Sequence, residues 1–230
     1  MFKYDKLVNK CESRGIPYQG RIDDIRVIVS NLCYHMSNSN EKVVEQAIKE
    51  FRLLKYIHDI KIDRDKCIIE YDEGTINFST IPEELFEFYR VSNLDKSKFS
   101  GNCHYVTQKA LESCRYDGMS AVTSLCINSN YIFYFHSYIH HAYYNDNDII
   151  DVIIDFSKNI MMDKDDYDKL FLHYEFNDLN YEEYEQKLDS SGYSAKRDNV
   201  CPLLYLACHE IEENNIDIDV LTNGNINMKR

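Results

Sequence analysis

The spacing of hydrophobic residues predicts a helical first third of the chain. In two stretches apolar side chains recur every three or four residues, which is the period of one helix face. They are Ile22, Ile25, Val29, Leu32, Cys33 and Met36, and then Val44, Ile48, Phe51, Leu54 and Ile57. A polar segment over 37–40 separates them, with Ser39 or Asn40 as N-cap of the second stretch. The pattern predicts an antiparallel pair of helices within residues 1–66.

From residue 67 the apolar period shortens to that of strands. Residues 67–71 and 75–78 flank Asp72-Glu73-Gly74, which predicts a hairpin. Thr80 and Glu83 stand at the spacing of a capping box that opens a short helix to about Tyr89. The polar stretch 92–102 predicts a loop.

The central and C-terminal segments predict an α+β fold. Helical spacing over 103–115 is followed by strand patterns at 119–128, 131–142 and 149–156, and then by helical patterns at 163–172, 181–188 and 199–213. A helix followed by a meander of strands is typical of α+β rather than doubly wound proteins. We predict a helical N-terminal portion, 1–66, and a second part, 67–230, with one helix packed on an antiparallel sheet and with C-terminal helices. The two parts can form one compact domain.

Charge narrows the range of partners. The 230 residues carry a formal net charge of −13, with 44% hydrophobic residues, enough for a core. An acidic surface repels nucleic acid and anionic lipid. We therefore expect no nucleic-acid or membrane partner, whereas a cationic peptide or protein is compatible.

The cysteines and the first residues bear on the compartment. The eight cysteines are irregularly spaced and include no CxxC pair, and Met1 to Lys6 lack the apolar core of a signal peptide. Apolar runs are too short to span a bilayer. We expect reduced thiols and a cytoplasmic location.

One cysteine stands where a thiol nucleophile is activated. Cys103 lies in Ser100-Gly101-Asn102-Cys103-His104, directly before the helical pattern. With Asn102 as N-cap, the thiol occupies the first helical position, where the helix dipole lowers its pKa. The backbone N–H of Cys103 and the side chain of Asn102 are candidate donors to an oxyanion.

A base and an orienting acid follow in chain order. His136 lies on the second strand pattern and shares a face with Tyr138 and His140. Asp155 and Asp151 share a face of the third, and either can orient the histidine. We prefer Asp155, because it ends the apolar run, and keep Asp151 as the alternative acid.

The order of these residues resembles a known group of enzymes. A Cys at a helix start, His136-Ser137-Tyr138 on a strand and Ile154-Asp155-Phe156-Ser157 after the next strand are similar to the transglutaminase-like branch of papain-fold cysteine hydrolases. The resemblance covers residues 98–160. It implies a papain-like core, a Cys103–His136–Asp155 triad and acyl transfer through a thioester, without metal or cofactor. The separation of His136 from Asp155 is long for that pattern, so the intervening hairpin must be enlarged.

The predicted function is thiol-dependent acyl transfer, most simply by a peptidase or amidase acting on a peptide or protein. Transglutaminase or acyltransferase chemistry is an alternative, because water exclusion decides the acceptor. A second alternative is a metal-dependent hydrolase that uses His136, His140 and the aspartates at 146, 148 and 151. A third is a non-enzymatic acidic protein-binding domain.

Overall fold

The computed structural model describes residues 21–37, 41–99, 101–115, 117–127, 133–145, 148–171 and 173–217. The chain is an α+β protein built on one antiparallel eight-stranded sheet, in the order β1-β2-β3-β7-β6-β5-β4-β8. The strands are β1 (Ile57–Asp63), β2 (Lys66–Tyr71), β3 (Gly74–Ser79), β4 (Met119–Ile127), β5 (Phe133–Asn145), β6 (Asp148–Asp155), β7 (Ile160–Asp163) and β8 (His173–Leu179).

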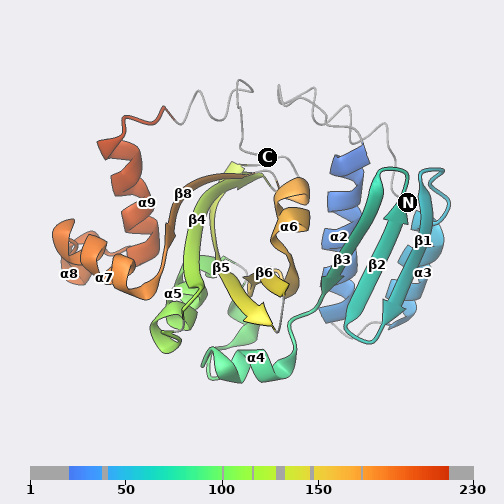
Figure 1. Cartoon of the computed structure of the whole chain (residues 1–230), viewed down its shortest axis with the longest axis horizontal. Helices are drawn as coiled ribbons and strands as arrows, with labels where there is room; N and C mark the ends of the chain where they lie inside the picture. The colour runs from blue at the N-terminus through green and yellow to red at the C-terminus, as the bar shows by residue number, and fades with distance from the viewer. Residues whose placement is uncertain are drawn as a thin grey trace.

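Helices cover both faces of this sheet (Figure 1). They are α2 (Arg21–Ser37), α3 (Glu41–Phe51), α4 (Glu83–Phe88), α5 (Cys103–Ser113), α6 (Lys164–Leu170), α7 (Tyr181–Ser190), α8 (Ala195–Asp198) and α9 (Pro202–Glu213), with a short 3-10 turn η1 (Lys96–Lys98) before α5. Alternation along the central strands places the two largest described core clusters on opposite faces of the sheet. Tyr138 and Ile153 pack with α2, α3 and α6, while Ile139 and Ile154 pack with α4, α5, α7 and α9.

The second predicted helix is shorter than its pattern, and a strand follows it. Helix α3 ends at Phe51, and Ile57 begins β1, which pairs with β2. A bulge between Ile57 and Asp59 places both Ile57 and Ile60 in the core. This irregularity breaks the alternation of a strand and leaves a spacing that fits a helix. The helical prediction for 52–57 was wrong, because Leu54 and Ile57 keep the apolar spacing and pack on the core although the helix has already ended at Phe51.

The first portion shares its sheet and core with the rest of the chain. Strand β1 lies within 1–66, yet it belongs to the common sheet. The cluster that holds Ile28 and Leu32 of α2 also holds Tyr138 of β5 and Tyr167 of α6. Residues 1–66 are therefore not helical throughout, because they supply an edge strand of the described sheet.

Other elements follow the predicted pattern with local differences. The hairpin of β2 and β3, the short helix α4, and helices α5, α6, α7 and α9 stand where helix or strand was predicted. The capping box does not form, because Pro82 is the N-cap of α4 and makes no side-chain cap bond. Strands β7 and β8 were not predicted. The candidate caps Ser39 and Asn40 lie outside the described residues.

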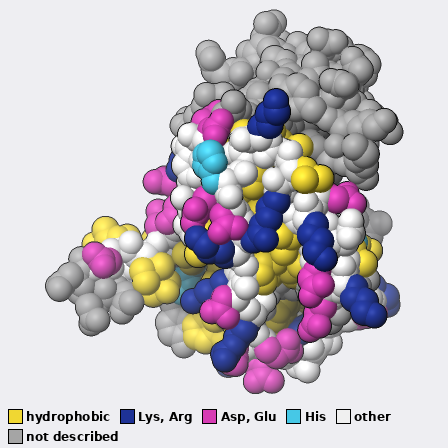
Figure 2. Space-filling model, turned by 90° about the vertical axis from the view of Figure 1, so that its right-hand side faces the viewer, with side chains coloured by type: hydrophobic (Ala, Val, Ile, Leu, Met, Phe, Trp, Pro, Cys, Tyr) yellow, Lys and Arg dark blue, Asp and Glu magenta, His cyan; other side chains and the backbone are white. Residues whose placement is uncertain are grey.

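The surface beyond β1 carries mixed charges. Figure 2 shows lysine and arginine side chains interspersed with aspartate and glutamate on this face. Lys61 Nζ lies 2.6 Å from Glu70, and Arg52 lies 2.9 Å from Asp59. The acidic excess is thus not gathered into one patch there. In the described part of the chain, no helix has the length and apolarity to cross a bilayer.

Gly118 fixes the start of β4 against β5. Its φ is +80°, and a β-carbon there would lie 1.8 Å from the carbonyl oxygen of Ala142. Gly192 has a similar φ of +70° with no atom within 4 Å of that position. We expect Gly192→Ala to cost about 1–2 kcal/mol for its backbone conformation. Gly118→Ala should cost about 1–3 kcal/mol more from the clash, as measured by urea unfolding. Equal losses would contradict the packing of Gly118.

Candidate functional site

Cys103 opens α5, the helix that packs against β4 and β5. Asn102 is the N-cap position, and Gly101 before it has a φ of +83°, which lets the chain turn into the helix. The Asn102 side chain does not cap the helix; its Nδ2 donates to the Lys98 carbonyl at 2.5 Å. The first N–H groups of a helix have no intrahelical acceptors. The thiol is therefore at the positive end of α5, and it is 8% exposed.

His136 lies in the part of β5 that does not pair with β6. Strand β6 pairs with β5 from Asn145↔Asp148 to Ile139↔Ile154 and ends at Asp155. His136 is thus beyond the last pair with β6 and is 2% exposed. Asp155 follows Ile154, so its side chain lies on the face of Tyr138 and reaches diagonally to His136. The imidazole Nε2 lies 2.7 Å from Asp155 Oδ2. This arrangement leaves Nδ1 as the ring nitrogen available to a further group.

Two imidazoles lower the pKa of the Cys103 thiol. Burial is the largest influence and raises its pKa, but hydrogen bonding to the side chains of His104 and His136, together with the charge of these rings, lowers the pKa to about 5. Burial is also the largest influence on His136 and lowers its pKa, but the charge of Asp155 and the hydrogen bonds to Asp155 and Cys103 together raise that pKa despite burial and the positive charge of Lys158. Opposite shifts in two adjacent groups favour a thiolate–imidazolium pair at neutral pH.

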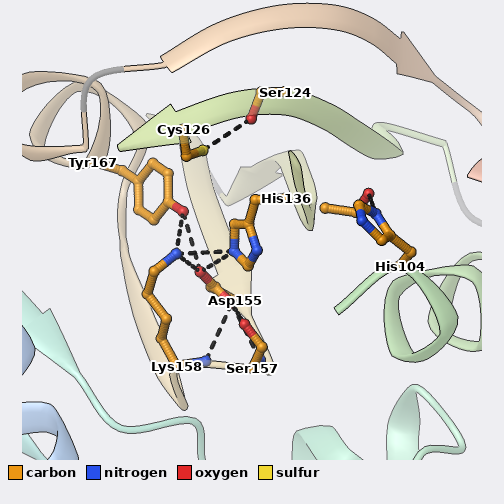
Figure 3. A network of polar contacts seen from close by, with 9 residues as sticks. His104, Ser124, Cys126, His136, Asp155, Ser157, Lys158 and Tyr167 are labelled. Carbon is orange, nitrogen blue, oxygen red and sulfur yellow. Dashed lines mark hydrogen bonds and ion pairs between the residues drawn. The ribbon is translucent and has the colours of Figure 1, made fainter. Parts of the chain in front are cut away.

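The Asp155 carboxylate is fully buried, and both of its oxygens accept hydrogen bonds (Figure 3). Oδ1 accepts from the Ser157 backbone N–H at 3.1 Å, from the Ser157 hydroxyl at 2.9 Å and from the Lys158 backbone N–H at 3.2 Å. Oδ2 faces His136 Nε2, the Lys158 ammonium and the Tyr167 hydroxyl. The charges of His136 and Lys158 and these bonds hold the pKa of Asp155 well below its usual range despite burial.

Lys158 and Tyr167 complete this network, and sequence reasoning did not find them. Lys158 Nζ contacts Asp155 Oδ2, His136 Nε2 at 2.9 Å and the Tyr167 hydroxyl at 3.2 Å. Tyr167 comes from α6 and donates to Asp155 Oδ2 at 3.1 Å. The only signal in the sequence was the position of Lys158 three residues after Asp155, which allows a return contact across a turn.

His104 is the second residue that sequence reasoning did not assign. Its Nδ1 lies 2.7 Å from the Ser137 hydroxyl, which lies 2.7 Å from the Thr123 hydroxyl. Thr123 and Ser137 are direct partners across β4 and β5, and both are buried. This chain of hydroxyls fixes the orientation of His104 beside the thiol. A Cys-His pair at a helix start was the available signal.

The remaining predicted residues lie in a separate arrangement. Asp151, the alternative acid, lies 2.6 Å from His140 Nε2 and not against His136. His140 Nδ1 lies 3.3 Å from Asp178 Oδ2. Within the described ranges, no group of three or more His, Cys, Asp or Glu side chains is placed to hold a metal ion. Asp146, part of the predicted metal cluster, lies outside those ranges.

Comparison with known proteins finds no matching family model, no matching curated protein and no matching solved structure. The site holds a thiol with a depressed pKa at a helix N-terminus, an imidazole beside it and a buried carboxylate behind that imidazole. Such a set can attack an electrophilic carbon and move the proton that the reaction requires.

Selective alkylation tests the depressed thiol pKa. At pH 6 a thiol with a pKa of about 5 is about nine-tenths ionised. Burial raises the pKa values of Cys67 and Cys126 to about 12 and about 11. Cys208 is exposed, but burial of its sulfur still raises its pKa. We expect iodoacetamide at pH 6 to modify Cys103 before Cys208, as followed by peptide mass spectrometry, and the rate to fall as the pH drops through about 5. Faster labelling of Cys208 at pH 6 would contradict this assignment.

Asp155→Asn should move the alkylation profile of Cys103 to higher pH. Without the carboxylate charge the pKa of His136 falls, so the thiolate loses its cationic partner and the thiol pKa rises. We expect the acid limb of the alkylation rate to shift upward by at least about one pH unit. The variant should also lose about 3 kcal/mol of stability, because a buried charge pair is broken. Asp151→Asn is the matched control and should leave the profile unchanged, since Asp151 contacts His140 instead.

Proposed function

We propose that this protein is a cysteine hydrolase that cleaves an amide bond of a peptide or protein through a thioester intermediate. We further propose that α5 and the antiparallel sheet form a papain-like core of the transglutaminase-like branch. Cys103 is the nucleophile, His136 the base and then the acid, and Asp155 the group that orients His136. No metal or cofactor takes part in the proposed reaction.

The observation that carries the proposal is the depressed pKa of Cys103, about 5, beside an imidazole bonded through Nε2 to a fully buried carboxylate. A structural cysteine of similar burial has the opposite shift, as Cys126 does with a pKa of about 11. Strongly perturbed groups that act on one another are typical of functional sites. Cys103, His136 and Asp155 also follow one another in the chain order that the resemblance to the transglutaminase-like branch implies.

In the first half of the proposed reaction the Cys103 thiolate attacks the carbonyl carbon of the scissile amide. The carbon–oxygen π electrons move to the oxygen, and the N–H groups at the start of α5 are donors for this oxyanion. Asn102 remains a candidate donor through the second hydrogen of its amide, since the first is directed to Lys98. The tetrahedral intermediate collapses, the carbon–nitrogen bond breaks, and His136 gives its proton to the leaving amine.

In the second half water attacks the thioester carbon. His136, now neutral, accepts a proton from the water, while Asp155 holds the ring in the required orientation and stabilises the imidazolium that forms. Collapse of this intermediate breaks the carbon–sulfur bond, releases a carboxylic acid and restores the thiolate–imidazolium pair. An amine in place of water would give a new amide, which is the transglutaminase or acyltransferase alternative.

The proposed substrate is a peptide or protein, with a preference for basic segments. The formal net charge of −13 attracts cationic chains and repels polyanions. We propose cytoplasmic action, because the proposed nucleophile Cys103 must be a reduced thiol and thiols stay reduced in the cytosol.

Intact-mass spectrometry with a panel of electrophilic acyl probes tests the proposal. We expect the wild-type protein to gain one acyl group and Cys103→Ala to gain none at pH 6, with loss of any peptide or amide hydrolysis. Cys208→Ala is the control and should keep the adduct. Far-ultraviolet circular dichroism should show that both variants are folded.

Two results would overturn this function. One is full hydrolytic activity in Cys103→Ala; the other is complete loss of wild-type activity on chelation alone, which would favour the metal-dependent hydrolase. A turnover assay with added primary amine separates the two thiol alternatives. Hydrolysis yields the acid, whereas acyl transfer yields the amine adduct.

A further inference from the structure

Lys158 is the one cation that touches both members of the His136–Asp155 pair in the described structure. Its Nζ contacts Asp155 Oδ2 and lies 2.9 Å from His136 Nε2, which itself lies 2.7 Å from the same Oδ2. The ammonium and the imidazole therefore share one carboxylate oxygen, as Figure 3 shows. When the imidazole is protonated, its Nε2–H and the ammonium are like charges side by side.

From these contacts we infer that Lys158 is a positioning residue that limits how strongly Asp155 holds the proton of His136. The inference rests on the proposed function, because it concerns the proton that His136 must give to the leaving amine. A fully buried carboxylate next to an imidazolium stabilises the charged ring. Lys158 offsets part of that stabilisation, so the ring remains able to donate.

The charges around His136 balance when Lys158 is included. Thiolate, imidazolium, carboxylate and ammonium from Cys103, His136, Asp155 and Lys158 sum to zero. Without the ammonium the remaining three would carry one net negative charge in a buried site. The imidazolium would then be the only cation between two anions, and it would keep its proton to higher pH.

The other titratable groups near His136 stay neutral over the relevant pH range or act on the thiol. Burial raises the pKa of Tyr134 to about 12 and of Cys126 to about 11, and it raises the pKa of Tyr167 well above its ordinary value. They come from β5, β4 and α6, and all are uncharged below about pH 10. From α5, His104 contacts the thiol and is held by Ser137. Lys158 is thus the group on these elements that can oppose Asp155 at neutral pH.

Lys158 lies in the turn between β6 and β7, and hydrogen bonds of this turn hold it in place. Its backbone N–H donates to Asp155 Oδ1 at 3.2 Å, so the residue is anchored to the carboxylate that its side chain also contacts. The side-chain ammonium contacts Asp155 Oδ2 and lies 3.2 Å from the Tyr167 hydroxyl. A substitution of the ammonium leaves the backbone anchor and the bonds from Ser157 in place.

The test compares Lys158→Met with Lys158→Arg by the pH dependence of Cys103 alkylation and by NMR titration of the His136 ring. Neither readout requires a substrate. In Lys158→Met we expect the alkaline transition, at which His136 loses its proton, to move upward by about one pH unit. Lys158→Arg keeps the charge and should stay near the wild-type value. Lys158→Gln gives the same comparison if the methionine variant does not fold.

An unchanged alkaline transition in Lys158→Met, or equal shifts in the neutral variants and in Lys158→Arg, would overturn the inference and leave Lys158 with a structural role. Failure of the proposed function has a different signature. In that case the wild-type protein would form no acyl adduct, or Cys103 would show no preferential alkylation at pH 6. The two proposals can therefore fail separately.

Discussion

The burial of the Asp155 carboxylate is the constraint on which the site depends. A buried carboxylate is costly unless its charge is balanced and its oxygens are bonded. Here six contacts meet both needs: three to Oδ1 from the turn after β6, and three to Oδ2 from His136, Lys158 and Tyr167. Because the turn, β5 and α6 each supply part of this shell, the carboxylate joins the sheet to the helix on one face.

The position of the carboxylate follows from the length of β6. This strand ends at Asp155, while β5 continues past it to His136, so the histidine is reached diagonally rather than across a strand pair. Helix α5 packs on the other face through Ile139 and Ile154 and begins with Cys103. Cys103 comes from the helix on one face and His136 points to the other, and they interact beyond the last pair between β5 and β6. The end of β6 therefore locates the site.

Sequence patterns predicted the members of the site that have strong local signals. Cys103 follows a glycine before a helical pattern, and Asp155 ends an apolar run, so each has a recognisable context. Lys158 and His104 have only weak signals, a position three residues after Asp155 and a position next to Cys103, since their roles depend on the shape of a turn and on the contact with Ser137. The fold shows the same division: long periodic helices were predicted, whereas β1 was missed because a bulge disturbs its alternation and β7 because it has only four residues.

The cysteines show how much the surroundings of Cys103 change its chemistry. Burial alone raises the pKa of a thiol, as at Cys126 on β4, where it is about 11. Cys103 is also largely buried, and its pKa is about 5. The pKa values of the two thiols thus differ by about six within one protein. Burial does not explain this difference, because it raises the pKa of both thiols. Its source is the pair of imidazoles, one held by Ser137 and the other by Asp155. The two polar networks behind the histidines therefore set the reactivity of a thiol that neither network touches directly.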